Sequence, residues 1–73
     1  MIVVITGGSK GIGKSICKNL LKKKIKVINI SRSICSLKDV KNYECDISNY
    51  RDVKETFRKI QKFDVLINNS GIS

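Results

Sequence analysis

Residues 6–15 form the segment of this sequence whose residue types and spacing could do chemistry. They read Thr-Gly-Gly-Ser-Lys-Gly-Ile-Gly-Lys-Ser and follow a β-branched run at residues 2–5. Glycines allow the backbone to turn sharply and to approach a ligand closely. A helix that begins directly after such a turn offers free N–H groups and the positive end of its dipole to a phosphate. The segment therefore predicts a phosphate-binding loop between a strand and a helix.

Two phosphate-binding motifs fit this loop, and the loop alone leaves both open. Residues 8–15 match the P-loop pattern G-x-x-x-x-G-K-S, in which Lys14 would reach the β- and γ-phosphates and Ser15 would bind Mg²⁺. That interpretation predicts a nucleoside triphosphatase-like segment that binds ATP or GTP. Residues 6–13 also match a T-G-x-x-x-G-x-G dinucleotide loop, in which Lys14 and Ser15 are ordinary residues of the first helical turn.

The elements that must position this loop alternate between strand and helix. Short apolar runs predict strands at residues 2–5, 27–30 and 64–68, with a weaker strand at 43–45. Apolar residues at helical spacing predict a helix that starts at Ile12. Asn49, with Asp52 three residues later, predicts the start of another helix. The apolar face of that helix consists of Val53, Phe57 and Ile60.

This alternation predicts an α/β fold, one half of a doubly wound Rossmann-type parallel sheet with strand order 3-2-1-4. The polar segment 33–41 is expected to hold one or two helical turns around Ile34, Leu37 and Val40, on the same face as the first helix. The helix after Asn49 then lies alone on the other face. Much of that face and the free edge of the fourth strand should be exposed, so we expect self-association, or poor folding without a complementing segment.

Three later segments decide between the two interpretations of the loop. The fourth predicted strand is followed by Asn-Asn-Ser-Gly at residues 68–71, the third by Asp46-Ile47 and the second by Ser31-Arg32. Together with the loop, these segments resemble the short-chain dehydrogenase/reductase family, which carries Asn-Asn-Ala-Gly at the first of these places. The resemblance implies that residues 1–73 form the N-terminal, incomplete part of an NAD(P)-binding domain. In the whole family, that domain serves hydride transfer between the cofactor and a carbonyl or alcohol substrate.

The resemblance places the catalytic residues of the family outside this sequence. Its Ser, Tyr and Lys constellation lies well downstream of the Asn-Asn-Ala-Gly segment, and only two residues follow Gly71 here. Tyr50 and Lys54 match the Tyr-x-x-x-Lys spacing, but they precede that segment and open a predicted helix. We therefore expect Tyr50 to be a surface residue and name no catalytic residue.

The end of the second strand points to the cofactor NADP rather than NAD. NAD-preferring sites usually place an acid there, which accepts hydrogen bonds from the ribose 2′-OH, whereas this sequence has Ser31-Arg32. A guanidinium can pair with a 2′-phosphate in two hydrogen bonds. Lys10 is similar to a second basic residue of NADP-preferring members. The resemblance implies this set of cofactor-binding residues: Gly7, Ser9, Lys10, Gly11, Ile12, Gly13, Ser31, Arg32, Asp46, Ile47, Asn68 and Gly71.

Composition excludes several other classes of function. The 73 residues include 15 Lys and Arg, 6 Asp and Glu, and no histidine, for a net charge of +9. Three cysteines without a C-x-x-C pair argue against a disulfide framework or a zinc site and indicate a reducing, cytoplasmic setting. We expect no signal peptide and no membrane span. The lysines at residues 22–26 lie where a helix ends, which suits its dipole, and few aromatic residues accompany them, so nucleic-acid binding is not predicted.

Overall fold

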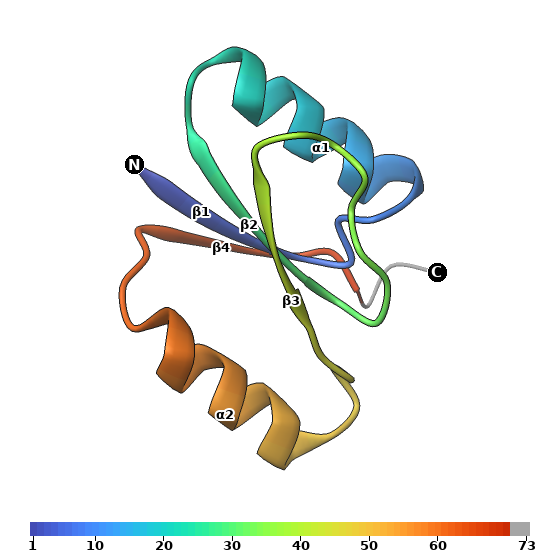
Figure 1. The fold of residues 1–73 in the computed structure, drawn as a ribbon, viewed down its shortest axis with the longest axis vertical. Helices are drawn as coiled ribbons and strands as arrows, with labels where there is room; N and C mark the ends of the chain where they lie inside the picture. The colour runs from blue at the N-terminus through green and yellow to red at the C-terminus, as the bar shows by residue number, and fades with distance from the viewer. Residues whose placement is uncertain (71–73) are drawn as a thin grey trace.

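The computed structural model describes residues 1–70, which form a four-stranded parallel sheet with one helix on each face (Figure 1). The elements are, in chain order, β1 (Ile2–Thr6), α1 (Gly11–Lys22), β2 (Lys26–Ser31), β3 (Val40–Glu44), α2 (Tyr50–Ile60) and β4 (Val65–Asn68). The strands lie in the order β3-β2-β1-β4, and every neighbouring pair is parallel. This order and the α/β class confirm the prediction from the sequence.

The core has two layers because β1 and β2 send apolar side chains to both faces of the sheet. Val4, Ile30 and Cys45 form a buried cluster toward α2, against which Val53, Phe57 and Ile60 pack. On the other face, a second cluster combines Ile5 and Val27 with Cys17 of α1. Val4 and Ile5 are both 0% exposed, so β1 is covered on both faces, as a continuous β-branched run predicts.

The prediction of helical turns within residues 33–41 is wrong: residues 33–39 form an irregular loop, and β3 begins at Val40. Asp39 has a left-handed φ of 75°, which ends any helix before the strand begins. Leu37 and Val40 instead pack directly against the cluster around Cys17 and fill the place expected for a helix. β3 also starts three residues earlier than predicted, because an edge strand with partly exposed faces lacks a continuous apolar run.

Local signals set the ends of the two helices. The Asn49 side-chain oxygen accepts a hydrogen bond from the Asp52 N–H at 3.1 Å, which makes Asn49 the N-cap of α2, as predicted. After α1, Lys24 has a φ of 61°, in the left-handed region that favours glycine. A lysine in that conformation costs roughly 1 kcal/mol, so the turn after α1 is held in a strained backbone conformation.

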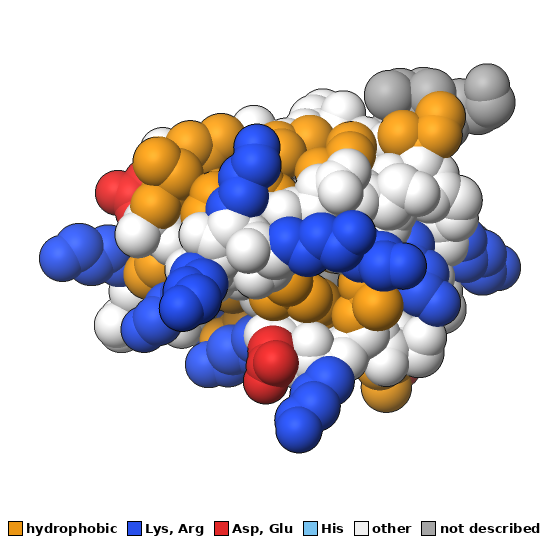
Figure 2. Space-filling model, turned by 90° about the horizontal axis from the view of Figure 1, so that it is seen from above, with side chains coloured by type: hydrophobic (Ala, Val, Ile, Leu, Met, Phe, Trp, Pro, Cys, Tyr) orange, Lys and Arg blue, Asp and Glu red, His pale blue; other side chains and the backbone are white. Residues whose placement is uncertain are grey.

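The surface of residues 1–70 is basic and carries apolar patches. β4 pairs only with β1, and Phe63, Val65 and Leu66 at and before this strand are more than one-third exposed. On the face seen from the side of α1, the Lys and Arg side chains are scattered among apolar and uncharged side chains (Figure 2). In the part of the chain that the structure describes, no helix has the length and apolar character needed to cross a membrane.

Candidate functional site

The glycine loop joins β1 to α1 and is shaped by close backbone contacts. Gly7 and Gly11 have φ values of 70° and 52°, which favour glycine. Gly13 lies in the first turn of α1, where an added Cβ would meet the carbonyl oxygen of Gly7 at 2.2 Å. The helix therefore begins directly on the loop backbone. Its N-cap residue, Lys10, provides no side-chain cap, which leaves first-turn N–H groups available to an anion.

Thr6 ties the end of β1 to the segment after β4. Its hydroxyl donates a hydrogen bond to the Asn68 side-chain oxygen at 3.1 Å and accepts bonds from the N–H groups of Asn69 and Ser70, at 3.0 and 3.1 Å. Asn69 also donates a side-chain bond of 3.0 Å to the Gly7 carbonyl. These bonds use the full capacity of the hydroxyl and hold the two strand ends together.

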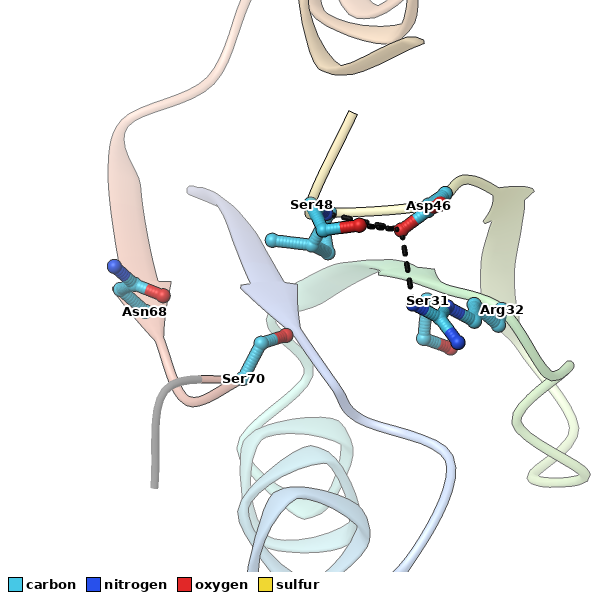
Figure 3. Close-up of a pocket in the computed structure, with 7 residues that line it drawn as sticks. Ser31, Arg32, Asp46, Ser48, Asn68 and Ser70 are labelled. Carbon is cyan, nitrogen blue, oxygen red and sulfur yellow. Dashed lines mark hydrogen bonds and ion pairs between the residues drawn. The ribbon is translucent and has the colours of Figure 1, made fainter. Parts of the chain in front are cut away.

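Two adjoining hollows lie at the carboxyl ends of the strands. The first has a volume of about 510 Å³ and lies between the ends of β2, β3 and β4 (Figure 3). It is lined by Ser31, Arg32, Asp46, Ile47, Ser48, Asn68 and Ser70. The second, of about 430 Å³, lies over the glycine loop, and Ser70 lines both. The remaining lining residues of the second hollow are Gly7, Ser9, Lys10, Gly11, Ile12, Gly13 and Asn69.

Every site residue predicted from the sequence lines one of these hollows, apart from Gly71, which lies outside the described residues. Lys10 and Arg32, the two basic residues on which the NADP prediction rests, line different hollows. A hydrogen bond between two hydroxyls connects the glycine loop to the segment after Arg32, since Ser9 Oγ lies 2.7 Å from Ser33 Oγ. The side chain of Ile12 is 66% exposed, so it belongs to the rim of the loop and not to the core stripe of α1.

Asp46 carries the negative charge of the first hollow. Its Oδ1 accepts bonds from the Ser48 hydroxyl at 2.6 Å, the Ser48 N–H at 3.0 Å and the Arg32 guanidinium at 3.1 Å (Figure 3). The Ser48 hydroxyl, followed by the Ser48 N–H and then Arg32, lowers the pKa of the Asp46 carboxyl. The side chains of Arg32 and Asp46 are 75% and 42% exposed, so their ion pair is weak and can open for a ligand.

Lys14, the lysine of the P-loop motif, does not line the hollow over the glycine loop. Lys14 Nζ donates a hydrogen bond to Ser36 Oγ at 2.9 Å, in the loop between β2 and β3. A P-loop lysine must instead reach the β- and γ-phosphates above the glycine loop.

Tyr50 is 78% exposed at the start of α2, which confirms that it is a surface residue. Within residues 1–70, no group of three acidic, cysteine or histidine residues is placed to hold a metal ion.

Sequence reasoning missed Asn29, which is fully buried in β2 beneath the glycine loop. Its side-chain oxygen accepts a hydrogen bond of 2.7 Å from the N–H of Gly8. Sequence reasoning also missed the hydrogen bonds by which Thr6 and Asn69 hold the ends of β1 and β4 together. A signal for Asn29 exists in the sequence, because it is a lone amide within the apolar run at residues 27–30.

Comparisons with known proteins place this arrangement in a family. The model of the short chain dehydrogenase family matches residues 1–73. The chain is 36% identical over 80 residues to 3-oxoacyl-[acyl-carrier-protein] reductase FabG of Buchnera aphidicola, covering 93% of this chain and 33% of the relative. It is 32% identical over 83 residues to carbonyl reductase family member 4 of Xenopus laevis, covering 99% of this chain and 35% of that protein. The chain thus spans about a third of the length of these relatives.

Solved structures agree with the sequence matches. A short chain dehydrogenase family protein from Francisella tularensis superposes with a TM-score of 0.83 at 33% identity, over 93% of this chain and 30% of the other. A short chain dehydrogenase from Leptospira borgpetersenii with bound NAD+ gives 0.81 at 29% identity, over 92% and 30%. With the family model, the strand order and the glycine loop in agreement, the chain belongs to the short-chain dehydrogenase family of oxidoreductases, whose members bind a nicotinamide dinucleotide.

Proposed function

We propose that this chain is the NADP(H)-binding segment of a short-chain dehydrogenase/reductase that transfers hydride between NADP(H) and a carbonyl or alcohol. The observation that carries the proposal is the pair of adjoining hollows at the carboxyl ends of the strands. One hollow is formed by a glycine loop and the other by the basic residue after β2. Open α/β sheets bind their ligands at this edge, where the strand order reverses between β1 and β4.

The glycine loop fits the diphosphate of such a cofactor. The 2.2 Å approach of a Gly13 Cβ to the Gly7 carbonyl means that a side chain here would push α1 away from the loop. Glycine keeps the helix N-terminus close to the loop, where its N–H groups stabilise an anion. Lys10 adds a positive charge at the rim of the same hollow.

The first hollow fits the adenosine half of the cofactor. Asp46 stays ionised at neutral pH and can accept a hydrogen bond from an amino group of the adenine, while Ile47 offers an apolar surface. Arg32 stands at the mouth without a carboxylate next to it in sequence, and its guanidinium has donors beyond the one given to Asp46. A 2′-phosphate would draw on those donors, whereas a 2′-hydroxyl offers Arg32 only a weak partner.

The segment supplies binding and orientation. When bound, the nicotinamide ring of the cofactor gives or accepts the hydride. The Ser, Tyr and Lys constellation expected from the family has no counterpart in residues 1–73, so we assign none of these residues a proton-transfer step. The carbonyl or alcohol substrate contacts belong to parts of the family's domain that this chain does not span.

The test compares NADPH with NADH by calorimetric titration of the whole gene product that carries residues 1–73. Arg32→Ala should lower the affinity for NADPH about tenfold to a hundredfold, because charge-assisted bonds to a phosphate are lost. Affinity for NADH should change little. Arg58→Ala is the matched control, since Arg58 is also an exposed arginine paired with one carboxylate, that of Glu55 at 3.8 Å.

Three outcomes would contradict the proposal. Equal losses for NADPH and NADH in Arg32→Ala would remove the role of Arg32 at the 2′-phosphate. A loss in Arg58→Ala as large as that in Arg32→Ala would show a general effect of positive charge. Binding of ATP with Mg²⁺ that disappears in Lys14→Ala would support the triphosphatase alternative instead.

A further inference from the structure

Asn29 is a buried amide whose oxygen and nitrogen are both hydrogen-bonded. It lies in the middle of β2, is 0% exposed, and no buried side-chain polar atom of residues 1–70 lacks a partner. Its Oδ1 accepts the Gly8 N–H at 2.7 Å, and its Nδ2 donates to Ser31 Oγ at 3.0 Å and to Asn42 Oδ1 at 2.9 Å. Burying an amide is costly unless its groups are bonded, so these partners are held in place together.

On one side, Asn29 fixes the orientation of a single peptide group in the glycine loop. The N–H of the Gly7–Gly8 peptide donates to Asn29, and the carbonyl of the same peptide accepts the Asn69 side-chain bond at 3.0 Å. A Cβ on Gly8 would lie 2.8 Å from Asn29 Oδ1 and 2.9 Å from Cys17 Sγ. Glycine at position 8 therefore makes room for the amide, and a planar peptide held at both ends cannot rotate.

On the other side, Asn29 reaches the segment that contains Arg32. Asn42 Oδ1 accepts both the Asn29 amide and the Cys35 N–H, the latter at 2.8 Å, and Asn42 Nδ2 donates to the Cys35 carbonyl at 3.2 Å. The Ser31 hydroxyl, also bonded to Asn29, donates to the Ser33 carbonyl. Both neighbours of Arg32 are thus bonded to the same buried network, Ser31 through its hydroxyl and Ser33 through its backbone carbonyl.

We propose that Asn29 is a positioning residue that sets the spacing between the diphosphate loop and the Arg32 segment. Through Asn42 it would thereby contribute to the choice between NADP(H) and NAD(H). This inference rests on the proposed function for its cofactor consequence. The relay from Gly8 through Asn29 and Asn42 to Cys35 is present without nucleotide and can be tested on its own.

The first test is amide hydrogen exchange of the whole gene product without nucleotide. Asn29→Ala should speed exchange at both Gly8 and Cys35 by about tenfold or more. The Gly8 N–H loses its acceptor, and the Cys35 N–H keeps an acceptor, Asn42 Oδ1, that Asn29 no longer holds in place. Asn42→Ala should speed exchange at Cys35 and leave Gly8 protected. Val27→Ala, a core truncation in the same strand, is the control and should affect the two amides equally. Unchanged protection at Gly8 in Asn29→Ala would overturn the relay.

The second test separates positioning from stability through the ratio of NADPH to NADH affinity. Asn29→Ala should weaken NADH by about tenfold, because the diphosphate loop is common to both cofactors, and NADPH several-fold more, because the bond to Asn42 is lost as well. Asn42→Ala, which keeps the Gly8 bond, should weaken NADPH several-fold more than NADH and so reduce discrimination. Val27→Ala should leave the ratio unchanged. A ratio unaffected by Asn42→Ala would overturn the proposal even if Asn29→Ala failed to fold.

The two tests also distinguish this inference from the proposed function. If the unsubstituted protein bound neither dinucleotide while the exchange results held, the proposed function would fail and the relay would stand as a structural network. If NADPH bound through Arg32 but neither asparagine variant altered affinity or ratio, the proposed function would stand and the positioning role would be rejected.

Discussion

Gly13 offers the sharpest perturbation of the glycine loop, because its neighbour is rigid backbone. An alanine Cβ at this position would lie 2.2 Å from the Gly7 carbonyl oxygen and 2.6 Å from Asn69 Nδ2. Ordinary contact needs more than 3 Å, so either α1 or the loop must shift by about an ångström. Overpacking of this kind costs roughly 1–3 kcal/mol in unfolding free energy. The shift would also separate the helix N-terminus from the loop, so nucleotide affinity should fall as well.

Gly11 is the matched control, since it lies two residues away and meets a different constraint. Its φ is 52°, and an added Cβ there would meet nothing within 4 Å. Gly11→Ala should cost about 1 kcal/mol through backbone strain alone, and Gly11→Asn should cost less because asparagine tolerates this conformation. Urea unfolding and NADPH titration of all three variants measure these differences. A Gly13→Ala protein as stable as Gly11→Asn, with undiminished affinity, would refute the close-approach argument.

Four further perturbations test separate parts of the structure. Asn49→Ala removes the N-cap of α2 and should lower the free energy of unfolding by about 1 kcal/mol in urea titrations. Lys24→Gly relieves a left-handed lysine and should raise the melting temperature, with a gain of up to about 1 kcal/mol. Since Ser48 lowers the folded-state pKa of Asp46, this carboxylate stabilises the fold above its unfolded pKa and loses that contribution as pH falls through the folded pKa. Asp46→Asn should therefore flatten the acid limb of the stability profile. Leu66→Lys on β4 should reduce any self-association seen by light scattering, and an unchanged profile would exclude this strand as the contact.

Local sequence signals were sufficient for the parts of the fold that depend on neighbouring residues. The run at residues 2–5 predicts the central strand, and Asn49 predicts the cap of α2. These features are set within a few residues of the chain, so propensity and spacing describe them well.

Features that depend on distant partners were not predictable in the same way. The loop at residues 33–39 is shaped by Asn42 and by packing under α1, and both override its helical spacing. Asn29 lies 21 residues from Gly8, and Thr6 lies 62 residues from Asn68. A side-chain hydrogen bond across such separations leaves no periodic pattern, so only the buried position of a lone polar residue could have indicated it.

The identity of the bound nucleotide is the most direct measure of the central claim, and chemical shift mapping of the whole gene product reports it residue by residue. With NADPH, we expect the amides of Gly7, Gly11 and Gly13 and the guanidinium of Arg32 to shift together. NADH should shift the glycines with little effect on Arg32. Shifts at the glycines and Lys14 with ATP and Mg²⁺, and none with either dinucleotide, would contradict the account.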